Sequence, residues 1–237
     1  MSRARLLLLS LVAALSVVGL SAASASAEIS FEWFVNGSAL ASGKQQTFEV
    51  NADGHNSDFS AKLGGTNILL LSSTIKVEPG ALLLGGKPGT SEEIIVFENV
   101  KVDSPSGCTV ESREAKPTPG TVKTVLLKNE IVEGENGEVL ILFTPKNAGQ
   151  PFTTLLLLGT CTGHDTPAEV TGSILGLPLP QRKEVVNQNI VFEAAEHNFF
   201  LSKGALDKAG LIFNKTTATL TGLTLITLTN GGAFGPF

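Results

Sequence analysis

The chain has 237 residues, of which 42% are hydrophobic and 16% charged, and its formal net charge is −5. Lys and Arg are scattered singly, and an acidic chain without a basic cluster is a poor partner for nucleic acid or an anionic membrane surface. We therefore predict no nucleic-acid partner. The length is sufficient for one β domain, or two small ones, with a sizeable core.

The first 27 residues have the three parts of a secretory signal peptide. Two arginines lie within the first five residues, an apolar run extends to Leu20, and small residues follow up to Ala27. The pattern predicts cleavage after Ala27, which would leave residues 28–237 as a secreted or cell-envelope-associated domain. No later stretch is apolar for the length of a membrane-spanning helix, so we expect no transmembrane segment after cleavage.

Short strands separated by Gly- and Pro-rich turns are expected in the first half of the mature chain. Residues 51–58 are polar and are interpreted as a turn. The strands are predicted at residues 29–35, 47–50, 67–71, 74–77, 81–84 and 93–102.

The two cysteines, Cys108 and Cys161, enclose three further expected strands, at residues 122–132, 138–143 and 152–159. Asn136-Gly137 predicts a tight hairpin between the first two, since Asn and Gly tolerate a positive φ. An even number of cysteines in an exported chain favours a Cys108–Cys161 disulfide, with two buried free thiols as the alternative. In the chain-entropy model, closing so long a loop lowers the conformational entropy of the unfolded state and so stabilises the folded state by roughly 4 kcal/mol.

The C-terminal part is predicted to contain strands at residues 169–175, 185–193, 197–201, 211–214 and 217–229. Residues 203–209 are the single expected helical turn. Residues 177–180 are expected to form a stiff extended connector, and a sub-domain boundary is placed near residues 177–184. In the last strand, apolar side chains alternate with threonines, which indicates one face on the core and one towards water.

About a dozen short strands with Gly and Pro turns predict an all-β fold. We expect an antiparallel β-sandwich, built from one or two closely packed pairs of sheets with one short helical turn. The four leucines at residues 155–158 do not alternate with polar residues. Such a run fits a central strand covered on both faces, or an interface.

One stretch has partial metal-binding character. Glu49, Asn51 and Asp53 place an oxygen ligand at every second residue before a glycine, as the front half of a calcium loop does. Glu49 stands where Asp is usual, and no helices are expected on either side. A weak calcium site and a plain polar turn are both kept as interpretations.

The sequence shows no motif of a hydrolase, metalloprotease or nucleotide-binding enzyme. We therefore predict no catalytic residue, no cofactor and no cofactor-binding residue. Carboxylates cluster at Glu133, Glu135 and Glu138, where we interpret them as solvent-exposed side chains of a hairpin turn. The three histidines are isolated in the sequence, and Trp33 in an apolar strand is interpreted as a core residue rather than a sugar-stacking platform.

Four short motifs occur in order at residues 62–65, 86–97, 107–110 and 218–222, namely Lys-Leu-Gly-Gly, Gly-Lys-Pro-Gly-Thr followed by Ile-Val-Phe, Gly-Cys-Thr-Val and Ala-Thr-Leu-Thr-Gly. In this order the chain resembles a group of uncharacterised secreted β-rich proteins of soil actinobacteria. The resemblance covers roughly residue 61 to the C-terminus. It implies a secreted β fold and no known activity.

The leading expectation is therefore a non-enzymatic exported β-sandwich. It would serve as an envelope-associated or extracellular interaction or structural module, with a protein or cell-wall partner. The alternative is a secreted hydrolase whose site is assembled from Glu, Asp and His residues distant in the sequence.

Overall fold

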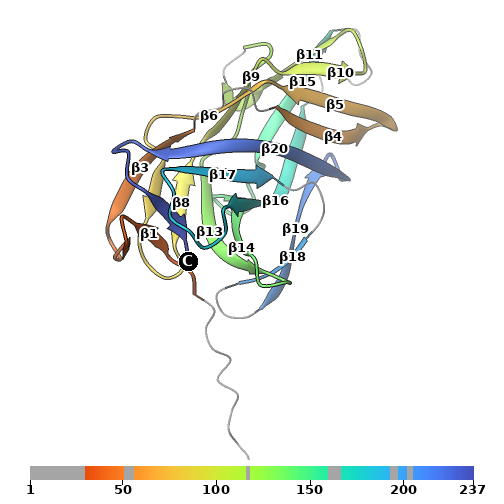
Figure 1. The fold of residues 1–237 in the computed structure, drawn as a ribbon. Coiled ribbons are helices and arrows are strands. Elements are labelled where there is room, and N and C mark those ends of the chain that lie inside the picture. The colour runs from red at the N-terminus through yellow and green to blue at the C-terminus, as the bar shows by residue number, and fades with distance from the viewer. Residues whose placement is uncertain (1–29, 51–55, 116–117, 160–166, 193–196, 202–204) are drawn as a thin grey trace, which may run out of the picture.

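The structure is a computed structural model that describes residues 30–50, 56–115, 118–159, 167–192, 197–201 and 205–237. Regular structure in these residues comprises 21 strands and one 3-10 turn, η1 (Arg113–Ala115). The predicted all-β antiparallel fold is thus confirmed (Figure 1). The predicted signal peptide lies outside the described residues.

Eight antiparallel strands form a closed ring, in which every strand pairs with two neighbours and the last strand pairs with the first. In ring order they are β3 (Gln45–Val50), β7 (Leu82–Leu84), β8 (Thr90–Glu93), β13 (Leu127–Gly134), β14 (Val139–Pro145), β16 (Ala168–Leu179), β17 (Asn187–Phe192) and β20 (Thr216–Leu228).

A second layer, the curled sheet, also contains eight strands and extends to the upper right of the ring in Figure 1. Strands β16 and β20 belong to both layers, because their N-terminal halves pair in the curled sheet and their C-terminal halves pair in the ring. The order is β11 (Cys108–Ser112), β15 (Thr153–Gly159), β16, β19 (Leu206–Phe213), β20, β4 (Ser57–Leu63), β5 (Thr66–Ser72) and β10 (Lys101–Ser104).

Seven short strands complete the fold. The first three-stranded sheet joins β1 (Trp33–Val35), β2 (Ser38–Ala39) and β21 (Phe234–Pro236), and so brings the two ends of the described chain together. The second consists of β6 (Thr74–Val77), β9 (Ile95–Glu98) and β12 (Val122–Lys123). Strand β18 (His197–Phe200) bridges β13 and β19.

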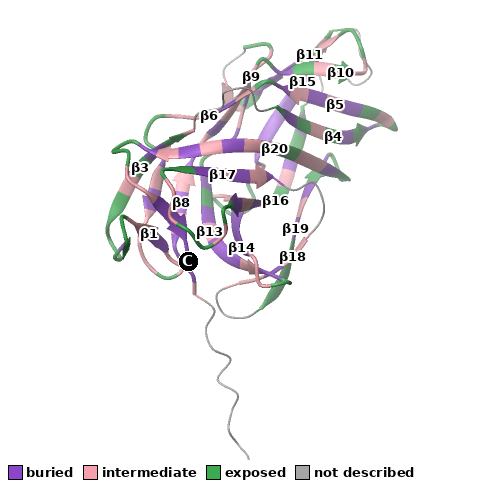
Figure 2. Ribbon diagram, viewed as in Figure 1, coloured by how far each residue is buried: buried purple, intermediate pink, exposed green. Residues whose placement is uncertain are grey.

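The main core lies on the inner faces of the ring and the curled sheet (Figure 2). Strand β20 shows the predicted alternation, since Ala218, Ile226 and Leu228 are buried whereas Thr217 and Thr221 are exposed. The inward side chains of this one strand therefore pack in the interiors of both layers. No helix in the described part of the chain has the length and hydropathy to cross a bilayer.

Strand β14 is buried on both faces. Its inward side chains, such as Ile141, join the main core, whereas Leu140 and Leu142 face outward against Phe199 of β18 in a second, smaller core. Two-sided burial is thus a property of β14. In β15 the burial of the leucines alternates instead, with Leu155 and Leu157 buried and Leu156 and Leu158 partly exposed.

Three local predictions are wrong. Residues 206–209, expected in a helical turn, begin strand β19 and pair with β18, because tertiary pairing overrides a weak helical propensity. The expected strand at residues 93–102 is divided among β8, β9 and β10, which belong to different sheets. Residues 177–179 are not a connector but the end of β16, where they pair with β17.

The ring is closely packed where β16 faces the core, which gives a stability prediction. A Cβ at Gly176 would lie 2.6 Å from Ile190 Cγ2 and 2.8 Å from Phe143 Cε2. We expect Gly176→Ala to lower the free energy of unfolding by about 1–3 kcal/mol through overpacking. Denaturant unfolding measures it, with Thr171→Val on the partly exposed face of the same strand as a near-neutral control. Equal effects of the two changes would contradict the packing described.

Candidate functional site

An apolar cavity lies beneath the curled sheet, where it meets the ring and the sheet β6–β9–β12. Its volume is about 70 Å³. Side chains from the curled sheet, the ring and β9–β12 line it, and their exposed surface is almost wholly apolar. Among the apolar lining residues are Leu70, Val122, Leu155, Val170, Ile174 and Leu211.

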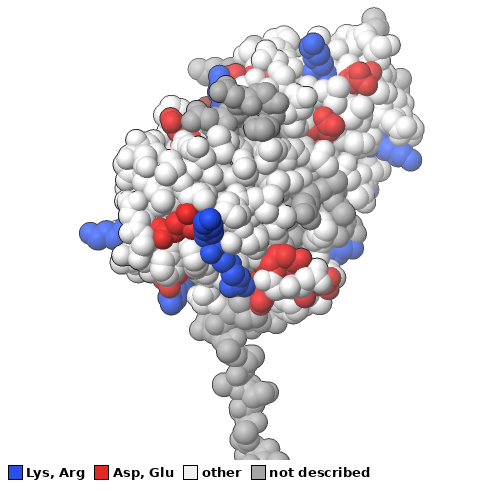
Figure 3. Space-filling model, viewed as in Figure 1, with Lys and Arg blue, Asp and Glu red and all other residues white. Residues whose placement is uncertain are grey.

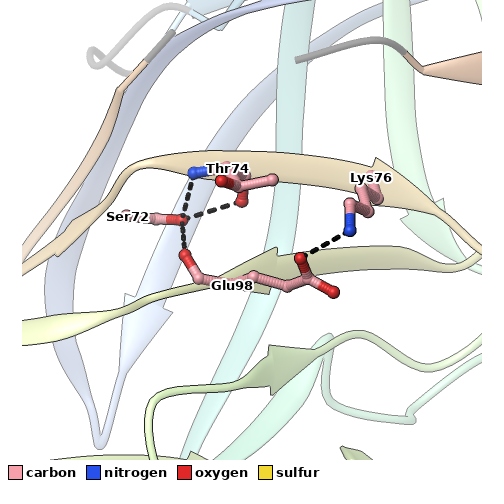
Figure 4. A network of polar contacts seen from close by, with 4 residues as sticks. All are labelled: Ser72, Thr74, Lys76 and Glu98. Atoms are coloured by element: carbon pink, nitrogen blue, oxygen red, sulfur yellow. Dashed lines mark hydrogen bonds and ion pairs between the residues drawn. The ribbon is translucent and has the colours of Figure 1, made fainter. Parts of the chain in front are cut away.

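Three of the four described hydroxyl side chains in the lining form hydrogen bonds with other groups of the protein. Ser72 Oγ donates to the carbonyls of Thr74 and Glu98, both at 2.9 Å (Figure 4). Thr124 Oγ1 accepts a hydrogen bond from the backbone N–H of Ile95, and Thr153 Oγ1 donates to Glu114. Because these hydroxyls are satisfied elsewhere, they offer little to a guest in the cavity.

Three lining residues of the cavity are more exposed than the rest. Phe59, Phe97 and Leu220 are only partly buried, whereas most other lining residues are buried. Phe59 pairs with Leu220 across β4 and β20 and packs edge-on against Phe213, with ring centroids 5.7 Å apart. These three side chains are therefore the part of the lining most accessible to solvent.

A buried polar cluster occupies the interior of the ring. Alternation along β8 turns Ser91 and Glu93 inward, while Glu92 points outward to Lys146, with 2.7 Å between Oε2 and Nζ. Asn129 Nδ2 donates to Ser91 Oγ at 2.9 Å. Burial raises the pKa of Glu93 to about 7, and a hydrogen bond with the Asn129 side chain partly opposes that rise.

Next to Glu93 lies a smaller internal space of about 10 Å³. Thr224 lines the same space and is 3% exposed. Its hydroxyl has no hydrogen-bond partner among the described protein groups. Ile95 and Phe192 line both this space and the larger apolar cavity, so the two are adjacent.

The hairpin carboxylates surround a separate surface hollow of about 130 Å³. Glu135, Glu138, His197 and Asn198 line it, so the fold brings two of the three clustered carboxylates near one histidine. Hydrogen bonds from the side chain and backbone of Asn136 hold the pKa of Glu138 below its usual value, and His197 contributes further. Glu138 is therefore an anion on the surface.

The fold places the predicted calcium ligands only in part. Glu49 is exposed on β3, while Asn51 and Asp53 lie outside the described residues. In the described residues, no group of three or more His, Cys, Asp or Glu side chains is arranged to hold a metal ion. The calcium hypothesis stays a prediction. Trp33 is a core residue, 2% exposed, and its Nε1 donates to the Thr90 carbonyl at 2.8 Å.

Only one of the two cysteines of the predicted disulfide lies among the described residues. Cys108 begins β11 and pairs with Gly159 at the end of β15, while Cys161 lies outside the described residues. The strand register therefore brings the chain to within two residues of Cys161 beside Cys108. The bond itself stays a prediction.

Figure 3 shows acidic and basic side chains mixed over one face of the molecule. The ion pair between Lys76 and Glu98, drawn in Figure 4, is partly exposed and measures 2.7 Å. Exposed pairs of this kind contribute about 0–1 kcal/mol, so the surface charges do not determine the fold.

Comparison of the chain with protein-family models, curated proteins and solved structures finds no match. The resemblance to secreted β-rich proteins of soil actinobacteria accordingly stays a hypothesis.

Glu93 predicts a pH-dependent stability. Its folded-state pKa of about 7 lies above the ordinary 4.5, so the folded state binds more protons between these values. The contribution of Glu93 to stability is therefore largest below pH 4.5 and falls by about 3 kcal/mol as the pH rises to 7. We expect Glu93→Gln to remove this loss, and Glu92→Gln, which changes the outward face of the same strand, to retain it. An unaltered pH profile in Glu93→Gln would contradict the assignment.

If Cys108 and Cys161 form the predicted bond, the unfolded, unreduced protein has no reactive thiol. Reduction, or replacement of both cysteines by alanine, should lower the free energy of unfolding by about 2–4 kcal/mol, because the unfolded chain regains its freedom. Thiol titration in denaturant and unfolding curves with and without reductant measure the two effects. Two titratable thiols before reduction would show that the bond is absent.

Proposed function

We propose that this chain is an exported, non-enzymatic binding module that holds a small apolar molecule, or the end of an alkyl chain, in the cavity beneath the curled sheet. It would act outside the cell or at the cell envelope. The signal-peptide pattern supports export, and the composition of the cavity supports apolar binding. Among the described residues, the side chains that line this cavity carry no carboxylate, imidazole or amine.

The observation that carries this proposal is an apolar space retained at the junction of the two layers. Protein interiors are normally close-packed, and a void lowers stability by about 24 cal/mol per Å³. For a cavity of about 70 Å³ the loss is roughly 2 kcal/mol. An alkyl group that fills the cavity supplies the van der Waals contacts that the void lacks. Its burial stabilises the complex by about 0.8 kcal/mol for each methylene.

The size of the cavity limits its guest. A water-sized group needs about 10–15 Å³ on this scale, so about 70 Å³ accommodates roughly five to seven such groups. The fully enclosed part of the guest is therefore a short alkyl segment or a small ring. A longer chain would extend past Phe59, Phe97 and Leu220 towards solvent.

The hollow beside Glu138 is the observation that favours the hydrolase alternative, because two carboxylates and a histidine meet there. Acid–base catalysis by a carboxyl group near neutral pH generally requires a raised pKa. Here hydrogen bonds from Asn136 shift the pKa of Glu138 in the opposite direction. The geometry therefore favours the binding module over the hydrolase.

The proposal predicts that an environment-sensitive apolar dye binds to the folded protein and is displaced by short alkyl compounds. Val170→Phe, which extends a ring into the cavity, should weaken binding at least tenfold because the space is filled. Fluorescence titration measures the affinities. Val186→Phe is the matched control, since Val186 is 50% exposed and lies away from the cavity.

Two outcomes would count against the proposal. One is that the folded wild-type protein does not bind the dye or any short alkyl compound. The other is that Val170→Phe and Val186→Phe bind with the same affinity as the wild type, which would place the binding site elsewhere.

A further inference from the structure

The two internal spaces together resemble one binding site with an apolar part and a polar end. The larger space is apolar and measures about 70 Å³, and the smaller measures about 10 Å³, enough for one water-sized group. Ile95 and Phe192 are wall residues of both. Small-molecule sites typically combine a mostly apolar lining with a few polar groups that fix the orientation of the ligand.

The polar end consists of Thr224 and Glu93, which line the smaller space. Both side chains are buried, at 3% and 5% exposure. The Thr224 hydroxyl has no partner among the described groups of the protein, and such a group is destabilising because it has lost its hydrogen bonds to water. A ligand hydroxyl placed there could bond both to Thr224 and to the Glu93 carboxyl.

The partly buried part of the cavity lining lacks such groups. Phe59, Phe97 and Leu220, the partly buried residues there, have no side-chain donor or acceptor. A polar group left at that part of the lining would be hydrated and would gain nothing from these side chains. A charged group inserted into the interior would be strongly disfavoured by desolvation.

We infer that the ligand is an alkyl chain bearing an uncharged hydroxyl, and that it binds with this hydroxyl inserted between Ile95 and Phe192 towards Thr224 and Glu93. This inference rests on the proposed function, because it requires the apolar cavity to be a ligand site. It adds the class of ligand and the direction in which the ligand enters.

The probes that test it are 1-hexanol and n-heptane, which have the same number of heavy atoms and differ by a hydroxyl in place of a methyl. Displacement of the apolar dye is measured for wild type, Thr224→Val and Thr224→Ser. Thr224→Val preserves shape but removes the hydroxyl, and Thr224→Ser preserves the hydroxyl. Thr154→Val removes a buried hydroxyl that lines neither space and is the matched control.

We expect Thr224→Val to weaken 1-hexanol binding about tenfold, as the loss of one buried hydrogen bond would, and to leave n-heptane binding unchanged. Thr224→Ser and Thr154→Val should bind both probes as the wild type does. If 1-hexanol binds equally to wild type and Thr224→Val, the hydroxyl does not reach Thr224 and the inference is overturned while the proposed function stands. If neither probe binds to the wild type, the proposed function itself fails.

A second measurement needs no variant. Isotope-labelled 1-hexanol bound to the wild-type protein should show nuclear Overhauser contacts from its hydroxyl-bearing carbon to the Thr224 methyl group and from its terminal methyl to the Phe97 ring. The reverse pattern would show that the hydroxyl faces solvent, and would overturn the inference even if Thr224→Val did not fold.

Discussion

Two long strands shared by two layers are the constraint on which the rest of this structure depends. Strand β16 has β15 and β19 as neighbours over its first half and β14 and β17 over its second, and β20 is divided in the same way between the curled sheet and the ring. Each of these strands therefore lines two interiors with one stripe of inward side chains. Side chains must fill both interiors as well as the junction between them.

Side-chain packing is incomplete at the junction between the ring and the curled sheet. Inward residues of the two layers meet there from different directions, and Ile95 and Phe192 divide the remaining space into an apolar part and a part that contains Glu93 and Thr224. A buried carboxyl and an unpartnered hydroxyl both reduce stability. Their position beside an apolar cavity accounts for the binding function that we propose, because a ligand can restore both the missing contacts and the missing hydrogen bond.

Local pattern was sufficient to predict much of the fold. The hairpin at Asn136-Gly137 joins β13 and β14, and Gly137 has a φ of +81°. The alternation along residues 217–229 was visible in the sequence and is observed in β20. Closure of the ring was not predictable in this way, because it depends on the pairing of β3 with β20, whose residues are far apart in the chain. Nor did the chain around Ile94 show that β8 and β9 belong to different sheets.

The candidate site was missed for a related reason. In the sequence, Glu92-Glu93 looks like a pair of surface carboxylates. Successive side chains of a strand point to opposite faces, so Ser91 and Glu93 lie on the same face of β8. That face could be recognised as internal only once Asn129, which is 38 residues after Ser91 in the chain, was known to pair with it.

The most direct test of this account is a crystal structure of the protein pressurised with xenon, which occupies accessible apolar cavities. The account predicts xenon density between Leu155, Val170 and Leu211, and none in the polar hollow beside Glu138. A junction without xenon, in which neighbouring side chains fill the space completely, would contradict the central claim that the two layers enclose a ligand cavity.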